Sequence, residues 1–145
     1  MTFEESVLIA APADAVWENL TSTQLAPQWM GDPEMAVELE TEWIVGGPVV
    51  VRGFHHVPFE NTGKVLAFEP GRRLVYTHLS SLSRLPDEPA SYTTLAFALS
   101  PVTDGSSLLL VASGFPTGAV FRHLKFYWGG ALACLRRQVE RIPQQ

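Results

Sequence analysis

Apolar and polar residues alternate along the middle of the chain. Between residues 35 and 43, one face carries Val37, Leu39 and Trp43, while the opposite face carries glutamates. A period of two with a charged outer face is typical of a half-buried antiparallel strand. Further strands are predicted at about 49–56, 63–69, 73–80, 91–100 and 106–114. The short turns between these segments predict an antiparallel meander.

Helical patterns occur on both sides of these strands. After a first strand at about 3–10, Pro12 suits the first turn of a helix, because its missing N–H would be unpaired there anyway. A second short helix is predicted near 25–29. From about 117 to 141, apolar residues recur every three to four positions, which predicts one long helix. The apolar stripe consists of Val120, Leu124, Trp128, Leu132, Leu135 and Val139.

This order of elements predicts a single α+β domain over residues 1–145, with a curved antiparallel sheet of about six to seven strands wrapped around the C-terminal helix. Hydrophobic residues make up 46% of the chain and charged residues 17%, against about 25% in typical soluble domains. The apolar excess requires a large core, a lined cavity or a subunit interface. A homodimer is therefore a candidate assembly.

The charge pattern excludes several classes of partner. The formal net charge is −5, whereas a nucleic-acid-binding protein needs a basic face to neutralise phosphates. No stretch approaches the roughly 20 apolar residues of a membrane span, and the acidic N-terminus is unlike a signal peptide. The sequence therefore predicts a cytoplasmic protein. Its single cysteine, Cys134, lies in an apolar helical stretch and is expected to be a buried free thiol.

Several short motifs follow one another along most of the chain. They are Pro12–Trp17 followed by Leu20, Leu25–Trp29, Gly46–Gly47, Gly63–Leu66, Pro70–Thr77, Ser113–Pro116 and Trp128–Leu135. In this order they resemble the START-related helix-grip superfamily (SRPBCC), and within it the activator-of-heat-shock-chaperone-ATPase-like (Aha-type) family. The resemblance implies a cavity between the sheet and the long helix. The chaperone-activating role belongs to a larger protein with an additional domain and is not carried over.

Strand alternation and this resemblance together predict which residues line the cavity. A ligand pocket of this kind has apolar walls and a few polar groups that orient the ligand. The polar candidates are His55, Tyr76 and His78, and their alternative role is that of hydrogen-bonded core residues. The complete predicted set of ligand-binding residues is Trp29, Trp43, Val51, His55, Tyr76, His78, Phe97, Leu110, Leu124, Trp128 and Leu132.

Motifs for a metal, a cofactor or a nucleophile are missing from the sequence. His55 and His56 are adjacent, so they point to opposite faces of a strand, and no zinc-ligand spacing is present. We therefore expect no metal and no cofactor. Gly129 and Gly130 are unusual, because a glycine inside a helix costs about 1 kcal/mol relative to alanine. They indicate either close packing against the sheet or extra room beside a pocket.

These observations favour a binding or carrier protein for a small apolar or amphipathic ligand, without assigned catalysis. Two alternatives remain open. One is an enzyme of the polyketide cyclase or aldol type, in which an inward histidine acts as general base. The other is a chaperone-associated interaction module that works through its outer surface and has a filled interior.

Overall fold

Seven strands and three α-helices make up residues 1–141, the part of the chain that the computed structural model describes. The strands are β1 (Thr2–Ile9), β2 (Glu38–Thr41), β3 (Pro48–His55), β4 (Val57–Glu69), β5 (Arg73–Ser80), β6 (Thr93–Val102) and β7 (Gly105–Ser113). The α-helices are α1 (Ala13–Thr21), α2 (Ala26–Met30) and α3 (Gly118–Arg141). Three short 3-10 helices are η1 (Pro33–Met35), η2 (Ser81–Ser83) and η3 (Pro89–Ser91).

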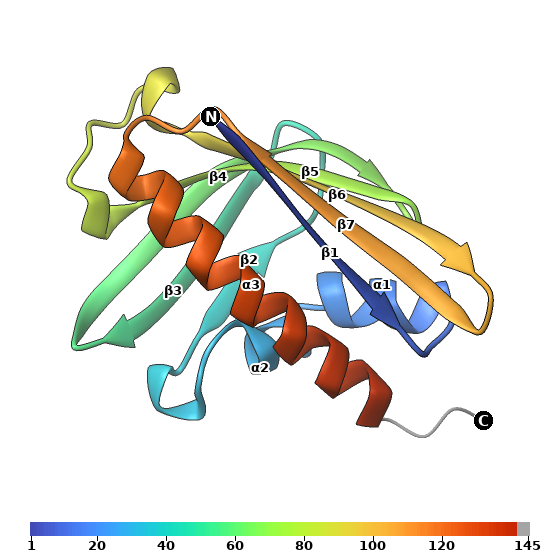
Figure 1. Cartoon of the computed structure of the whole chain (residues 1–145). Helices are drawn as coiled ribbons and strands as arrows, with labels where there is room; N and C mark the ends of the chain where they lie inside the picture. Colours follow the sequence, from blue (N-terminus) through green and yellow to red (C-terminus); the bar gives the residue numbers. More distant parts are fainter. Residues whose placement is uncertain (142–145) are drawn as a thin grey trace.

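The strands form one antiparallel sheet in the order β1-β7-β6-β5-β4-β3-β2. From β2 to β7 each strand pairs with the next one along the chain, and β1 joins the far edge at β7. The sheet curves around α3, which runs diagonally across it (Figure 1). These features confirm the predicted α+β fold with a long C-terminal helix and two short helices after the first strand.

The core lies where the inner faces of β6 and β7 meet α3. Phe97 pairs with Leu110, and Leu95 pairs with Ala112, so these side chains point to the same face and are buried. The stripe of α3 from Leu124 onward is buried with them. Each fully buried Leu or Phe contributes roughly 1.5–3 kcal/mol. The main contacts of α3 are with β1, α2 and α1, at one side of the sheet.

The predicted strand at 35–43 is wrong at both ends. Met35 ends η1, Ala36 has a left-handed φ of 48°, and β2 starts only at Glu38. At the other end Trp43 has a φ of 53°, which interrupts an extended ladder. Its indole Nε1 donates a hydrogen bond to the Thr21 carbonyl at 2.8 Å and so joins this segment to α1.

The short turn expected between the predicted strands at 49–56 and 63–69, marked by Pro58 and Gly63, is also wrong, because β4 begins at Val57 and continues through it. The chain reverses instead at His56, whose φ is 65°. Pro58 lies beside this reversal, where a missing N–H disturbs the sheet least. Gly63 is a strand residue, and a Cβ added to it would overlap the Thr77 carbonyl oxygen. Close approach of two strands therefore explains this glycine, and a turn does not.

A membrane span was not expected, and within residues 1–141 no helix has the length and apolar character to cross a membrane. The cytoplasmic location stays a prediction.

Candidate functional site

A pocket of about 890 Å³ lies between α3 and the inner face of β3, β4 and β5. It forms because α3 packs mainly on β1, α1 and α2, which leaves the opposite half of the sheet without a close cover. Residues of α2, η1 and η2 complete the walls. The volume falls within the roughly 300–1,000 Å³ of small-molecule pockets.

The apolar wall of the pocket comes from three parts of the chain. Val49 and Val51 alternate along β3 and face inward. Leu124 and Ala131 of α3 stand opposite them in the lining. Met35 and several neighbours after α2 add to this wall. An apolar molecule of moderate size would therefore contact hydrocarbon on several sides.

Polar side chains follow β4 and β5 along the same inner face. Asn61 pairs with Ser80, and His78 pairs with Thr93 of β6. Tyr76, two residues before His78, lies on the same face as these residues. The Asn61 Oδ1 and Thr93 Oγ1 atoms are buried and have no hydrogen-bond partner within the described chain. The pocket therefore has a polar strip beside its apolar wall.

Aromatic rings form a continuous row at the inner end of the pocket. The Phe97 ring lies 6.0 Å from Tyr76 and 5.4 Å from Trp128, measured between centroids. Trp29 continues the row 6.0 Å from Trp128. Tyr127 is edge-on to Trp128 at 5.2 Å, and its hydroxyl donates to the Met30 carbonyl at 2.7 Å. The Trp128 Nε1–H, in contrast, is buried without an acceptor among residues 1–141.

Three titratable side chains of the pocket, those of Tyr76, Tyr127 and His78, are uncharged near neutral pH. Burial, and to a lesser extent Tyr127, raises the pKa of Tyr76, so its hydroxyl stays protonated. Burial also raises the pKa of Tyr127. For His78, burial and then the neighbouring His123 lower the pKa from 6.5 to about 4. A neutral imidazole at pH 7 follows from this shift.

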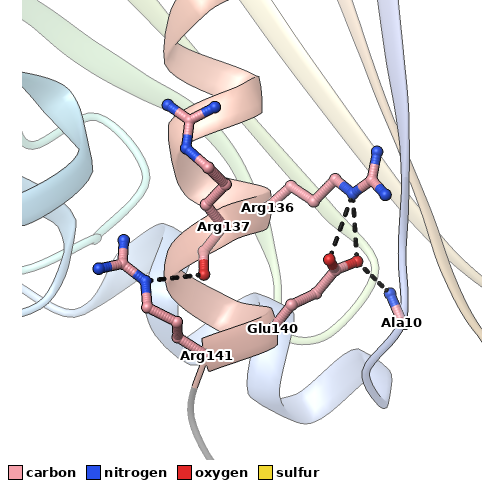
Figure 2. A network of polar contacts seen from close by, with 5 residues as sticks. All are labelled: Ala10, Arg136, Arg137, Glu140 and Arg141. Carbon is pink, nitrogen blue, oxygen red and sulfur yellow. Dashed lines mark hydrogen bonds and ion pairs between the residues drawn. The ribbon is translucent and has the colours of Figure 1, made fainter.

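Charged side chains gather at the C-terminal end of α3. Figure 2 shows Glu140 accepting hydrogen bonds from the Ala10 backbone N–H at 2.8 Å and from Arg136 Nε at 3.2 Å, which ties the helix end to the chain after β1. Arg137 and Arg141 extend on the other side of the helix and belong to the pocket lining. This end of the pocket is therefore cationic, unlike the polar strip.

The structure brings most of the predicted ligand-binding residues together. Those that line the pocket are Trp29, Val51, His55, Tyr76, His78, Leu124 and Trp128. Four others lie outside the lining: Phe97, Leu110 and Leu132 are buried in the core, and Trp43 stacks on Phe68 at 5.9 Å. Two of these four contact lining residues directly, because the rings of Phe97 and Trp43 both lie against Tyr76.

Other lining residues were not predicted. Phe59 and Asn61 were missed because their segment was taken as a turn, although alternation counted back from Val65 places both on the inner face. Cys134 was expected to be buried and is instead half-buried in the lining. Gly130 also lines the pocket, and an added Cβ there would meet no atom within 4 Å, which favours extra room over close packing.

A metal centre was not expected, and in the described part of the chain no three His, Cys, Asp or Glu residues are grouped so as to hold a metal ion.

Comparison with known proteins places this architecture in a family. A family model described as Activator of Hsp90 ATPase homolog 1-like protein matches residues 10–140. A comparison with curated proteins gave no match.

Solved structures share the whole fold at low sequence identity. Protein CV1439 from Chromobacterium violaceum is 21% identical with a TM-score of 0.84, over 99% of this chain and 98% of that one. The Aha1 dimer from Colwellia psychrerythraea is 17% identical with a TM-score of 0.76, over 97% and 96%. DynU16, a putative protein in the dynemicin biosynthetic locus, is 23% identical with a TM-score of 0.74, over 96% and 47%. At these identities the likeness shows the fold.

Proposed function

Because the chain belongs to the family of Activator of Hsp90 ATPase homolog 1-like proteins, we propose that it binds a small apolar or amphipathic molecule in the pocket between α3 and the sheet. The observation that carries this proposal is the pocket of about 890 Å³ with a mostly hydrocarbon wall. Trp29, Val51 and Leu124 supply apolar contact, and Tyr76 and His78 supply orientation.

The expected driving force is burial of apolar surface. A ligand that buries roughly 300 Å² of apolar area gains about 7.5 kcal/mol at 25 cal/mol per Å². The loss of translational and rotational freedom subtracts from this gain. Affinity in the micromolar range or weaker follows for a ligand held by apolar contact alone, and polar contacts add selectivity.

The cyclase alternative receives less support from the chemistry of the site. A general base works best when its pKa lies near the operating pH, whereas the pKa of His78 is lowered to about 4. Such an imidazole is a weak base at pH 7. The likeness to DynU16, a putative protein in a biosynthetic locus, is one of fold. A His78→Gln variant that loses turnover of a candidate substrate, while retaining its affinity, would favour the enzyme instead.

The interaction-module alternative expects a filled interior, and the open pocket counts against it. Self-association is a separate proposal. It is supported by the neighbour from Colwellia psychrerythraea, which was solved as a dimer. Analytical ultracentrifugation would test it: a species of twice the 16.0 kDa chain mass is expected, and a monomer at high micromolar concentration would refute it.

Native mass spectrometry of freshly purified protein tests ligand binding. We expect a discrete excess mass that is released on denaturation. Val51→Trp is the matched control, because the larger ring fills the pocket from its wall and should abolish the excess mass without unfolding the chain. If neither protein carries an excess mass, and added naphthalene derivatives show no heat of binding in calorimetry, the proposal is refuted.

A further inference from the structure

We propose that the pocket takes an amphipathic molecule with one anionic headgroup, a carboxylate on an unbranched alkyl chain. The headgroup pairs with Arg137 and Arg141 at the C-terminal end of α3, and the chain lies along the inner side of this helix. This inference rests on the proposed function and narrows its ligand class.

Permanent positive charge in the pocket lining is confined to one end. Among the described residues, the lysine and arginine side chains of the lining are those of Arg137 and Arg141. The whole chain has 15 acidic and 10 basic residues, yet the described lining holds a single carboxylate side chain, that of Asp32. Asp32 forms no ion pair with either arginine within residues 1–141. Because a guanidinium stays charged at all relevant pH values, an anion would find a permanent counter-charge at this end.

The fold does not use these two guanidinium groups in an ion pair among residues 1–141. Arg136 pairs with Glu140 at 3.2 Å, on the side of α3 turned toward the end of β1 (Figure 2). Arg137 instead donates to the Cys134 thiol at 3.1 Å, and Arg141 donates to the Arg137 carbonyl oxygen at 3.3 Å. Since Cys134 lines the pocket, this contact holds the Arg137 guanidinium beside it. A guanidinium has five N–H donors in a planar fork that matches a carboxylate.

A small residue leaves room for an alkyl chain between the arginines and the aromatic end of the pocket. The lining runs along α3 through Tyr127, Gly130, Cys134 and Arg137, which recur every three or four residues and so share one face. A Cβ added to Gly130 would meet no atom within 4 Å. From Tyr127 to Arg137 the helix rises about 15 Å, which is close to the length of an extended decanoate. Val51 supplies apolar contact from the sheet.

Three decyl compounds with different headgroups test the charge preference at pH 7. They are decanoate, 1-decanol and decyltrimethylammonium, which present an anion, a neutral hydroxyl and a cation on the same chain. Binding is followed by tryptophan fluorescence, because Trp29 and Trp128 line the pocket. We expect decanoate to bind about tenfold more tightly than decanol, as a hydrogen bond to a charged group provides. The ammonium compound should bind most weakly.

Glutamine variants assign the preference to its residues. Arg137→Gln should lower the decanoate-to-decanol ratio of affinities to about threefold or less, and the double variant with Arg141→Gln should bring the ratio near one. Both arginines are exposed, so these variants should fold. Arg136→Gln is the matched control. It removes the same charge from the same end of α3, but Arg136 lies outside the lining, so the ratio should stay nearly unchanged.

The outcomes distinguish this inference from the proposed function. Equal binding of decanoate and decanol would overturn the inference, since the arginines would then serve only the helix dipole, and the proposed function would stand. Tightest binding of the ammonium compound would overturn it in favour of a cation at Asp32. A ratio that survives in the double variant, or that falls equally in Arg136→Gln, would overturn the assigned residues. If none of the three compounds binds, the inference fails, and native mass spectrometry with the naphthalene probes decides the proposed function separately.

Discussion

A variant without His78 should lose less stability in acid than the wild type, because the wild type buries an imidazole that resists protonation. The folded protein lowers the pKa of this imidazole from 6.5 to about 4, through burial and then through His123. The unfolded chain therefore binds the proton more readily, so the stability contribution is complete above about pH 7 and falls as the pH drops from 6.5 toward 4. Between about pH 7.5 and 5 the expected loss is about 2 kcal/mol, and it approaches about 3 kcal/mol near pH 4.

Urea unfolding at about pH 7.5 and pH 5 measures this loss in wild type and in His78→Gln. We expect the wild type to lose about 2 kcal/mol more than the variant over this interval. His56→Gln, at the exposed β3–β4 reversal, controls for the removal of a histidine. His123→Gln should shift the midpoint of the His78 imidazole titration upward in NMR. Equal acid losses in wild type and His78→Gln, or a His78 midpoint near 6.5, would refute the reasoning.

Three further substitutions test the scaffold around the pocket. Gly63→Ala should cost at least about 3 kcal/mol in urea unfolding or prevent folding, because its Cβ would overlap the Thr77 carbonyl; a near-neutral effect would mean that β4 and β5 are farther apart. The Ala10 N–H and then Arg136 lower the pKa of Glu140, so Glu140→Gln should be less stable than wild type at pH 7. This difference in stability should close below about pH 4, as the carboxylate is protonated. A difference that persists at pH 2 would contradict this explanation. Leu110→Ala should cost about 2–5 kcal/mol by creating a cavity in the fully buried core behind the pocket, and a cost below about 1 kcal/mol would show that the site collapses.

The hydrophobic pattern was sufficient to predict the architecture, because apolar residues recur with a clear helical or strand period in most elements. The stripe of α3 and the alternation in β6 and β7 were predicted correctly. The stripe is buried from Leu124 onward, with Val120 half-buried, and the inward-facing residues of β6 and β7 are buried. Element boundaries were harder where backbone conformation, not hydrophobicity, decides them. The left-handed Ala36 and Trp43 shorten β2, and neither residue type signals that conformation. At Pro58 and Gly63 the usual turn residues occur inside a strand.

The site was predictable to the extent that it follows strand alternation. Val51, His55, Tyr76 and His78 fall on the inner face by that rule and line the pocket. The other pocket-lining residues depend on long-range geometry. The lining of α3 past Trp128 depends on how the helix tilts across the sheet, and no local pattern encodes that tilt. The missing acceptor of the Trp128 indole is likewise visible only once the neighbouring chain is in place.

The most direct test of the pocket is an NMR measurement with selectively methyl-labelled protein and 2-isopropenylnaphthalene. If the molecule binds between α3 and the sheet, intermolecular NOEs should connect its ring protons to the methyl groups of Val51 and Leu124, which line the pocket from opposite sides. NOEs confined to Val57 and Leu66, which are each 49% exposed outside the pocket, would contradict the account.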